Sequence, residues 1–85
     1  MIYVDELRWF GWHRWCHMVT DGPIDELHVF ADRIGLKREW FQEKGSTHHY
    51  DLMTAMREKA VKAGAVEVST AQLGQMLING KVTRK

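Results

Sequence analysis

Residues 15–35 read WCHMVTDGPIDELHVFADRIG and contain a strand pattern followed at once by a helix pattern. Residues 15–20 are rich in aromatic and β-branched side chains and predict a strand. Residues 21–23, Asp-Gly-Pro, supply a helix cap and a proline suited to the first helical turn. Apolar side chains then recur at helical spacing, at Ile24, Leu27, Phe30, Ala31 and Ile34. Gly35 ends the predicted helix.

The same alternation of strand and helix patterns extends in both directions. Further strands are predicted at residues 2–4, 36–41 and 65–68, and further helices at residues 52–63 and 70–79. Ser69 or Thr70 is expected to cap the last helix. This order predicts an α/β fold: a small single-domain sandwich at residues 1–80, with three helices and a partly parallel sheet of about four strands. Residues 81–85 are expected to form a frayed basic tail.

The composition limits the class of protein. The chain has 85 residues, a net charge of +1 and one cysteine. A nearly neutral charge gives no strong electrostatic argument for a nucleic acid or an anionic membrane. The single Cys16 excludes an internal disulfide and is interpreted as a small buried residue in a reducing compartment. Because the sequence shows no signal-peptide pattern and no membrane-spanning pattern, we expect a soluble, cytoplasmic protein with no membrane association.

Residues 7–15 combine aromatic and basic side chains. Arg8, His13 and Arg14 are interleaved with Trp9, Phe10, Trp12 and Trp15, and Gly11 interrupts any regular pattern. We interpret this stretch as a partly ordered loop whose rings cover the core, since a small domain needs them for burial. The alternative is an exposed surface, because aromatic rings mixed with arginine can stack on nucleic-acid bases.

Residues 48–51, His-His-Tyr-Asp, are the first candidates for chemistry. In a strand-like conformation, His49 and Asp51 face one way and Tyr50 the other. A histidine and a carboxylate side by side can bind a divalent metal, or the carboxylate can orient the imidazole as a base. In the alternative reading, Asp51 caps the following helix and the two histidines are solvated. No zinc-binding signature matches this spacing.

Other polar residues fall near the ends of predicted elements. Asp5 follows a strand, where α/β sheets bind ligands, although strands also commonly end in this way. His28 borders the apolar stripe and is either a hydrogen-bonded boundary residue or part of the same pocket as His49. His17 is either an inter-strand hydrogen-bonding group or a catalytic one. Arg57 could clamp an anionic group with its planar fork, or form a surface ion pair.

Several short motifs resemble a known family. They are Tyr3-Val4-Asp5, Glu26-Leu27-His28 with Phe30-Ala31, Ile34-Gly35-Leu36 and His49-Tyr50-Asp51-Leu52. Over about the first seventy residues the chain resembles a small domain-of-unknown-function family found in bacteria and their phages. The family's characteristic polar positions match Asp5, His17, His28, His49, Tyr50, Asp51 and Arg57. The resemblance implies a shared pocket at these positions and carries no activity with it.

Two functions from different classes are compatible with these features. The first is a metal-dependent hydrolase or phosphodiesterase that acts on a nucleotide, another anionic small molecule or a nucleic acid. Its expected residues are Asp5, His49 and Asp51 for a divalent metal, His17, His28, His49 and Tyr50 for catalysis, and Arg57 and Trp15 for the substrate. The alternative is a non-enzymatic phage or bacterial module that binds a host protein or nucleic acid. In a third reading, the polar residues only form a stabilising hydrogen-bond network.

Overall fold

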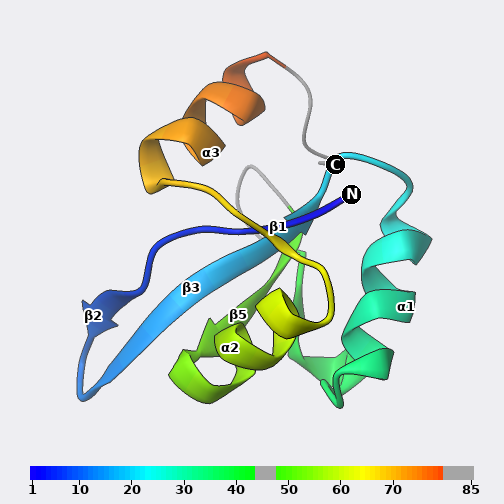
Figure 1. The fold of residues 1–85 in the computed structure, drawn as a ribbon, viewed down its shortest axis with the longest axis horizontal. Coiled ribbons are helices and arrows are strands. Elements are labelled where there is room, and N and C mark those ends of the chain that lie inside the picture. Colours follow the sequence, from blue (N-terminus) through cyan, green and yellow to red (C-terminus); the bar gives the residue numbers. More distant parts are fainter. Residues whose placement is uncertain (44–47, 80–85) are drawn as a thin grey trace.

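The computed structural model describes residues 1–43 and 48–79 (Figure 1). The strands are β1 (Ile2–Val4), β2 (Arg8–Phe10), β3 (His13–Thr20), β4 (Phe41–Gln42), β5 (His49–Met53) and β6 (Val66–Glu67). The helices are α1 (Ile24–Arg33), α2 (Thr54–Lys62) and α3 (Thr70–Ile78), and a 3-10 turn spans Arg38–Trp40. Residues 44–47 and 80–85, which include the expected tail at 81–85, lie outside the described residues.

The strands form one mixed sheet. Its order is β4-β5-β3-β1-β6, and β2 pairs with β3 as a hairpin. β1 and β6 are parallel, while the other pairs are antiparallel. The predicted α/β fold with three helices and a partly parallel sheet is therefore confirmed. Within the described residues the sheet has six strands rather than about four, because β2 and β5 were not predicted.

The two faces of the sheet are covered differently. Cys16 and Met18 of β3 are buried against α1 and α2, whereas Val19 packs against Leu73 of α3 on the opposite face. Figure 1 shows α1 and α2 on one side of the sheet and α3 on the other. His17 shares a face with Val19, because side chains alternate along a strand, but its side chain stays exposed. The face that carries α3 thus has an open half around His17.

Of the three helix-end signals given above, the structure confirms the Gly35 stop and the Ser69 cap but not the cap at Asp21 or Gly22. Gly35 ends the first helical segment with φ of 89°, as predicted for a glycine stop. Ser69 caps α3 in a capping box, since its hydroxyl accepts from the Gln72 N–H and the Gln72 side chain accepts from the Ser69 N–H. The predicted cap at Asp21 or Gly22 is wrong, because Pro23 occupies the cap position of α1 without a side-chain hydrogen bond.

The strand predicted at residues 36–41 is wrong for most of its length. Leu36 is buried in the core, but Arg38–Trp40 form a 3-10 turn and only Phe41 joins a strand. The consecutive charged residues in this stretch lack the alternation of a half-buried strand.

The helix predicted at residues 52–63 begins two residues late. Tyr50 and Leu52 are both buried on one face of β5, which pairs with β3 before α2 starts at Thr54. The alternating burial of residues 49–53 therefore has the period of a strand.

The interpretation of residues 7–15 as a loop that covers the core is wrong. β2 pairs with the start of β3 through a turn in which Gly11 adopts φ of 66°. The hairpin extends away from α1, α2 and α3 (Figure 1), so none of the helices in the described part of the chain packs on its tip. Its side chains are consequently exposed, to 73% for Trp9, 81% for Phe10 and 91% for Trp12.

Candidate functional site

β1 ends in an irregularity that brings the Asp5 carboxylate onto the neighbouring strand. Pairing with β3 runs as far as Val4 and resumes at Arg8, with one residue more on this strand than on β3. Such an extra residue is a β-bulge. Asp5 lies in the bulge and is fully buried. Its Oδ1 accepts from the backbone N–H of His17 at 2.6 Å, and its Oδ2 lies 3.0 Å from His17 Nδ1.

The contact with Asp5 determines which nitrogen of His17 is available. An ionised carboxylate only accepts hydrogen bonds, so the hydrogen of a neutral imidazole resides on Nδ1 and the lone pair on Nε2. Histidines that bind metals commonly donate their second nitrogen to a carboxylate in this way, which fixes the ring and raises its basicity. In the Asp5–His17 pair, Nε2 is therefore the His17 nitrogen that could bind a metal.

His17 meets two further candidate ligands on the open face of the sheet. Asp51 is the cross-strand partner of His17, and His49 lies two residues before it on β5. One potential ligand atom from each side chain lies within 4.8 Å of the others. The two imidazole rings are edge to face with centroids 5.0 Å apart, and His49 Nε2 lies 3.3 Å from Asp51 Oδ1. The hydrogen bond from His49 lowers the pKa of Asp51, which favours the carboxylate form.

Two imidazoles and one carboxylate are a donor set that first-row transition metals accept. Such sets bind zinc, manganese, iron, cobalt or nickel, whereas magnesium prefers oxygen ligands. Donor atoms bonded to one ion at about 2.1 Å lie at most about 4.2 Å apart. Atoms already within 4.8 Å therefore need only a small side-chain adjustment to share an ion. Three protein ligands also leave coordination positions for water or substrate.

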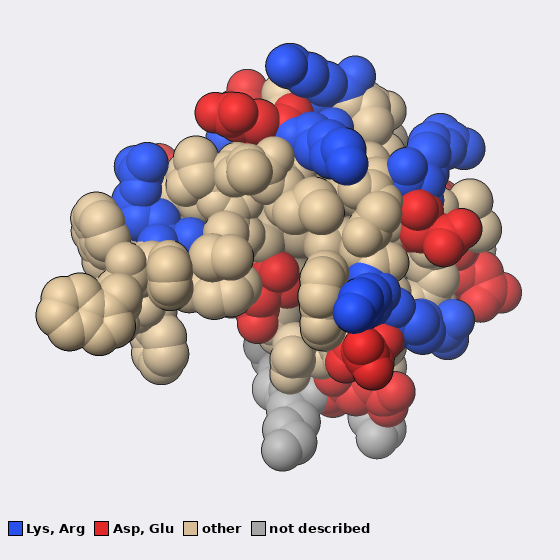
Figure 2. All heavy atoms as spheres, turned by 90° about the horizontal axis from the view of Figure 1, so that it is seen from below, with Lys and Arg blue, Asp and Glu red and all other residues tan. Residues whose placement is uncertain are grey.

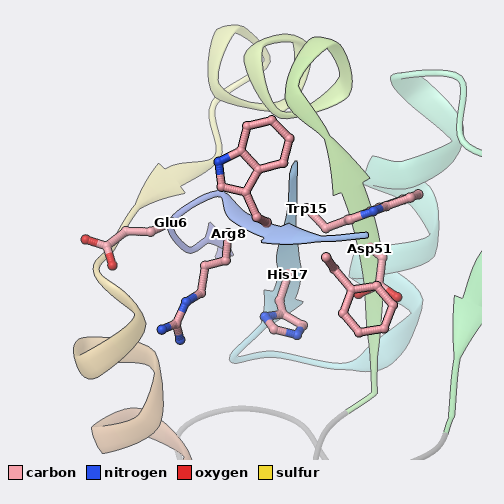
Figure 3. A pocket seen from close by; sticks show the side chains of 7 residues that line it. Glu6, Arg8, Trp15, His17 and Asp51 are labelled. Carbon is pink, nitrogen blue, oxygen red and sulfur yellow. The ribbon is translucent and has the colours of Figure 1, made fainter. Parts of the chain in front are cut away.

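A cleft of about 660 Å³ opens beside His17 and Asp51 of this cluster. It is lined by Glu6, Arg8, Trp9, Phe10, Trp15, His17 and Asp51. In Figure 3 the side chains of Arg8 and His17 point to the same side of the sheet. Arg8 is the cross-strand partner of Trp15, so the cleft continues from the His17 cluster onto the hairpin.

The structure brings together only part of the residues expected from the sequence. His49 and Asp51 are adjacent as expected, and Trp15 lines the same cleft. Asp5 lies behind His17 rather than beside His49, so His17 takes the third place in the candidate ligand set. The sequence interpretation did not single out Glu6. Arg8 and Phe10 entered it only as members of the aromatic and basic stretch at residues 7–15, whose alternative interpretation was an exposed surface.

Arg57 lies away from the cleft. Its Nε donates to the backbone oxygen of Asp5 at 2.9 Å, and its Nη1 donates to Glu67 Oε1 at 2.9 Å. The side chain thereby joins α2 to the end of β1 and to β6. This placement favours the ion-pair alternative for Arg57 over the binding of an anionic substrate.

His28 and Tyr50 form a separate pair on the helix-covered face of the sheet. His28 Nδ1 lies 2.8 Å from the Tyr50 hydroxyl, and both side chains line a cavity of about 150 Å³ with Arg38. Burial lowers the pKa of His28 and raises the pKa of Tyr50, so Tyr50 donates to a neutral imidazole. His28 therefore does not share a pocket with His49, which faces the other way.

Cys16 is also turned away from the cluster. It is buried beneath the helices, and burial raises the pKa of its thiol to about 12. A neutral thiol is a poor metal ligand, so the interpretation of Cys16 as a small core residue agrees with its position.

Protonation of His28 is expected to destabilise the protein. Burial lowers the pKa of His28 from its ordinary 6.5 in the folded state. Below pH 6.5, His28 therefore takes up a proton more readily in the unfolded chain than in the folded protein. The stability contributed by the neutral imidazole is thus complete above about pH 6.5 and is lost as the pH falls through the folded pKa. Urea unfolding at pH 7.5 and 5.0 should show a smaller loss of stability in His28→Gln than in wild type. An equal loss in both proteins would contradict this prediction.

Comparison with known proteins assigns the chain to a family. In the described residues, no helix is long and apolar enough to span a membrane. Neither the curated proteins nor the solved structures compared with the chain gave a match. A family model matches residues 2–80, further than the first seventy residues over which the motifs had indicated a resemblance. Since this match spans nearly the whole sequence, the chain belongs to the family described as protein of unknown function (DUF4031).

Proposed function

We propose that this protein is a metal-dependent hydrolase that cleaves phosphodiesters in nucleotides or nucleic acids. The observation that carries the proposal is the cluster of His17, His49 and Asp51, with the buried Asp5 carboxylate behind His17. A purely structural role does not require two imidazoles and a carboxylate to converge at an open surface. His17 and Asp51 of this cluster also line a cleft large enough for a small ligand.

The chemistry follows from the donor set and the cleft. A divalent ion held by these ligands would lower the pKa of bound water toward 7 and neutralise charge on a phosphoryl oxygen. Water would add to phosphorus as it loses a proton, the ester P–O bond would break, and the leaving alkoxide would take up a proton to depart as an alcohol. Arg8 supplies a cation in the same cleft for the phosphate. In this proposal His17 serves as a ligand rather than as acid or base, and Arg8 replaces Arg57 as the anion-binding group.

Hydrolysis of a chromogenic phosphodiester tests the proposal. Chelator-treated protein should be inactive and should regain activity with Mn²⁺, Co²⁺, Ni²⁺ or Zn²⁺. We expect His49→Ala to lower the rate at least about 100-fold, since losing even an outer partner of a ligand costs 10- to 100-fold. His13→Ala is the matched control, because His13 is an exposed histidine on β3 outside the cluster. Activity that is absent with every metal, or equal in the two variants, would overturn the proposal.

A second candidate function is a non-enzymatic module that binds a host protein or nucleic acid. The three exposed aromatic rings of the hairpin favour it, since exposed rings of this kind are frequent interface anchors. Such a module would bind its partner without turnover, and His49→Ala would leave binding unchanged. If His49→Ala altered neither binding nor turnover but only stability, the reading as a hydrogen-bond network would hold.

A further inference from the structure

The β2–β3 hairpin presents an unusual density of exposed aromatic surface. Trp9, Phe10 and Trp12 lie within four residues and are between 73% and 91% exposed. Small monomeric proteins seldom leave large rings together in water without a partner for them. Trp9 and Phe10 belong to a paired strand and Trp12 to the turn that follows it, so the backbone holds the three rings near one another.

The same hairpin carries positive charge between its rings. The Arg14 guanidinium lies 5.8 Å from the centre of the Trp9 ring, and Arg8 follows on the opposite face of the hairpin. The carboxylates that line the adjoining cleft are Glu6 at the base of the hairpin and Asp51 in the ligand cluster. Figure 2 shows uncharged atoms at the left-hand tip with Lys and Arg atoms beside them and Asp and Glu atoms set further back. The tip is therefore complementary to a partner that is both aromatic and anionic.

The spacing of these groups suits unpaired bases. Phe10 and Arg8 are alternate residues of β2, and alternate side chains on a strand are separated by about 7 Å. This distance is twice the 3.4 Å interval between stacked bases, so one base fits between the ring and the planar guanidinium. In a duplex, both faces of each base are already stacked. A single strand offers the base faces and the phosphates together.

The hairpin also leads into the candidate metal site. On one face of the sheet Phe10 is followed by the cross-strand pair of Arg8 and Trp15, and then by His17. All four side chains line the same cleft. A strand whose bases stack on the hairpin would therefore pass its next phosphodiester over His17.

We infer that the β2–β3 hairpin is a stacking platform for unpaired bases, and that the substrate is single-stranded nucleic acid rather than a mononucleotide or a duplex. The part of this inference that concerns the substrate rests on the proposed hydrolase function. Binding to the hairpin does not require the metal and can be tested without it.

Fluorescence anisotropy of labelled 15-nucleotide DNA and RNA, measured with chelator present, tests the inference. We expect single strands to bind at least about tenfold more tightly than the matching duplex. Trp12→Ala and Phe10→Ala should each weaken binding roughly 5- to 150-fold, the effect of losing one stacked base. Arg14→Gln should reduce the slope of log affinity against log salt concentration by about one, the change expected when one phosphate contact is lost.

Trp40→Ala provides the matched control. Trp40 is 44% exposed and lies 5.6 Å from Lys37 Nζ, so it repeats the pairing of a ring with a cation outside the hairpin. Its replacement should leave binding of the single strand within twofold of wild type. Because Trp12 is 91% exposed, its removal should not change the thermal midpoint, which excludes unfolding as the cause of lost binding.

Three results would overturn the inference: no binding of single strands, equal binding of single strands and duplex, or equal losses in Trp12→Ala and Trp40→Ala. Preferential binding to phosphatidylglycerol vesicles would overturn it in favour of a membrane surface. These outcomes are distinct from failure of the proposed function. Metal-dependent cleavage of the chromogenic ester could persist without strand binding, and His49→Ala should still bind the single strand when the metal is chelated.

Discussion

A transition-metal ion should raise the thermal stability of the chelator-treated protein, and His49→Ala or His17→Ala should abolish that rise. An ion that binds only the folded state stabilises it by about 2.7 kcal/mol at a hundredfold excess over its dissociation constant. For a domain of this size, that corresponds to an increase in the melting midpoint of roughly 10–20 °C. Differential scanning fluorimetry with Mn²⁺, Co²⁺, Ni²⁺, Zn²⁺ and Mg²⁺ measures it directly. The response to Mg²⁺ should be smallest, because two of the three donors are nitrogen.

Variants of histidines outside the cluster control for adventitious binding. His13→Ala removes an exposed histidine from the same strand as His17 and should retain the full rise. His28→Ala removes a histidine from the opposite face and should lower the starting midpoint while retaining the rise. A rise that survives in His17→Ala and His49→Ala, or that disappears in His13→Ala, would place the metal elsewhere.

Two substitutions of Asp5 should separate its contribution to folding from its contribution to the metal site. In Asp5→Ala, the backbone N–H and the Nδ1–H of His17 lose the carboxylate oxygens at 2.6 and 3.0 Å. A buried donor left without a partner costs about 1–3 kcal/mol. Because the His17 side chain is about half exposed, its Nδ1–H can turn to water, so we expect a loss of roughly 1–3 kcal/mol in the free energy of unfolding. Asp5→Asn retains the shape and one acceptor oxygen, and its stability should lie nearer to wild type.

Asp5→Asn should nevertheless weaken metal binding about 10- to 100-fold. Its amide nitrogen donates toward His17 Nδ1, which favours the tautomer with the hydrogen on Nε2 and removes the lone pair needed by the metal. Urea unfolding gives the stability and isothermal titration with Zn²⁺ gives the affinity. Asp25→Asn, an exposed aspartate in the first turn of α1, is the control. An affinity in Asp5→Asn equal to that of the control would show that Asp5 does not orient His17.

Local patterns predicted those parts of the fold in which neighbouring residues decide the structure. The strand and helix of residues 15–35 and the Ser69 cap needed only periodicity and helix-end signals. Residues 49–53 were harder, because Leu52 and Met53 fit either the start of a helix or the end of a strand. Only pairing with β3 decides between them. The hairpin was missed because its three-residue strand is too short to establish a period.

The candidate site shows the same division between local and long-range information. Alternation on one strand predicted that His49 and Asp51 share a face. That His17 joins them depends on the register between β3 and β5, and that Asp5 lies behind His17 depends on a bulge. His28 could not be placed from its helix alone, since the face that packs on the sheet is set by tertiary contacts. Strand register, the bulge and the packing of the helix are interactions between segments distant in sequence, which residue spacing does not encode.

NMR spectra of the histidine side-chain nitrogens test most directly whether His17 and His49 hold a metal. The chain has five histidines, and long-range ¹H–¹⁵N spectra distinguish their Nδ1 and Nε2 atoms. We predict that one equivalent of Zn²⁺, added to chelator-treated protein, shifts Nε2 of His17 and one ring nitrogen of His49, while His17 Nδ1 keeps its hydrogen. The signals of His13 and His28 should remain unchanged. Unchanged signals from His17 and His49, with or without changes at His13 or His28, would contradict the metal site.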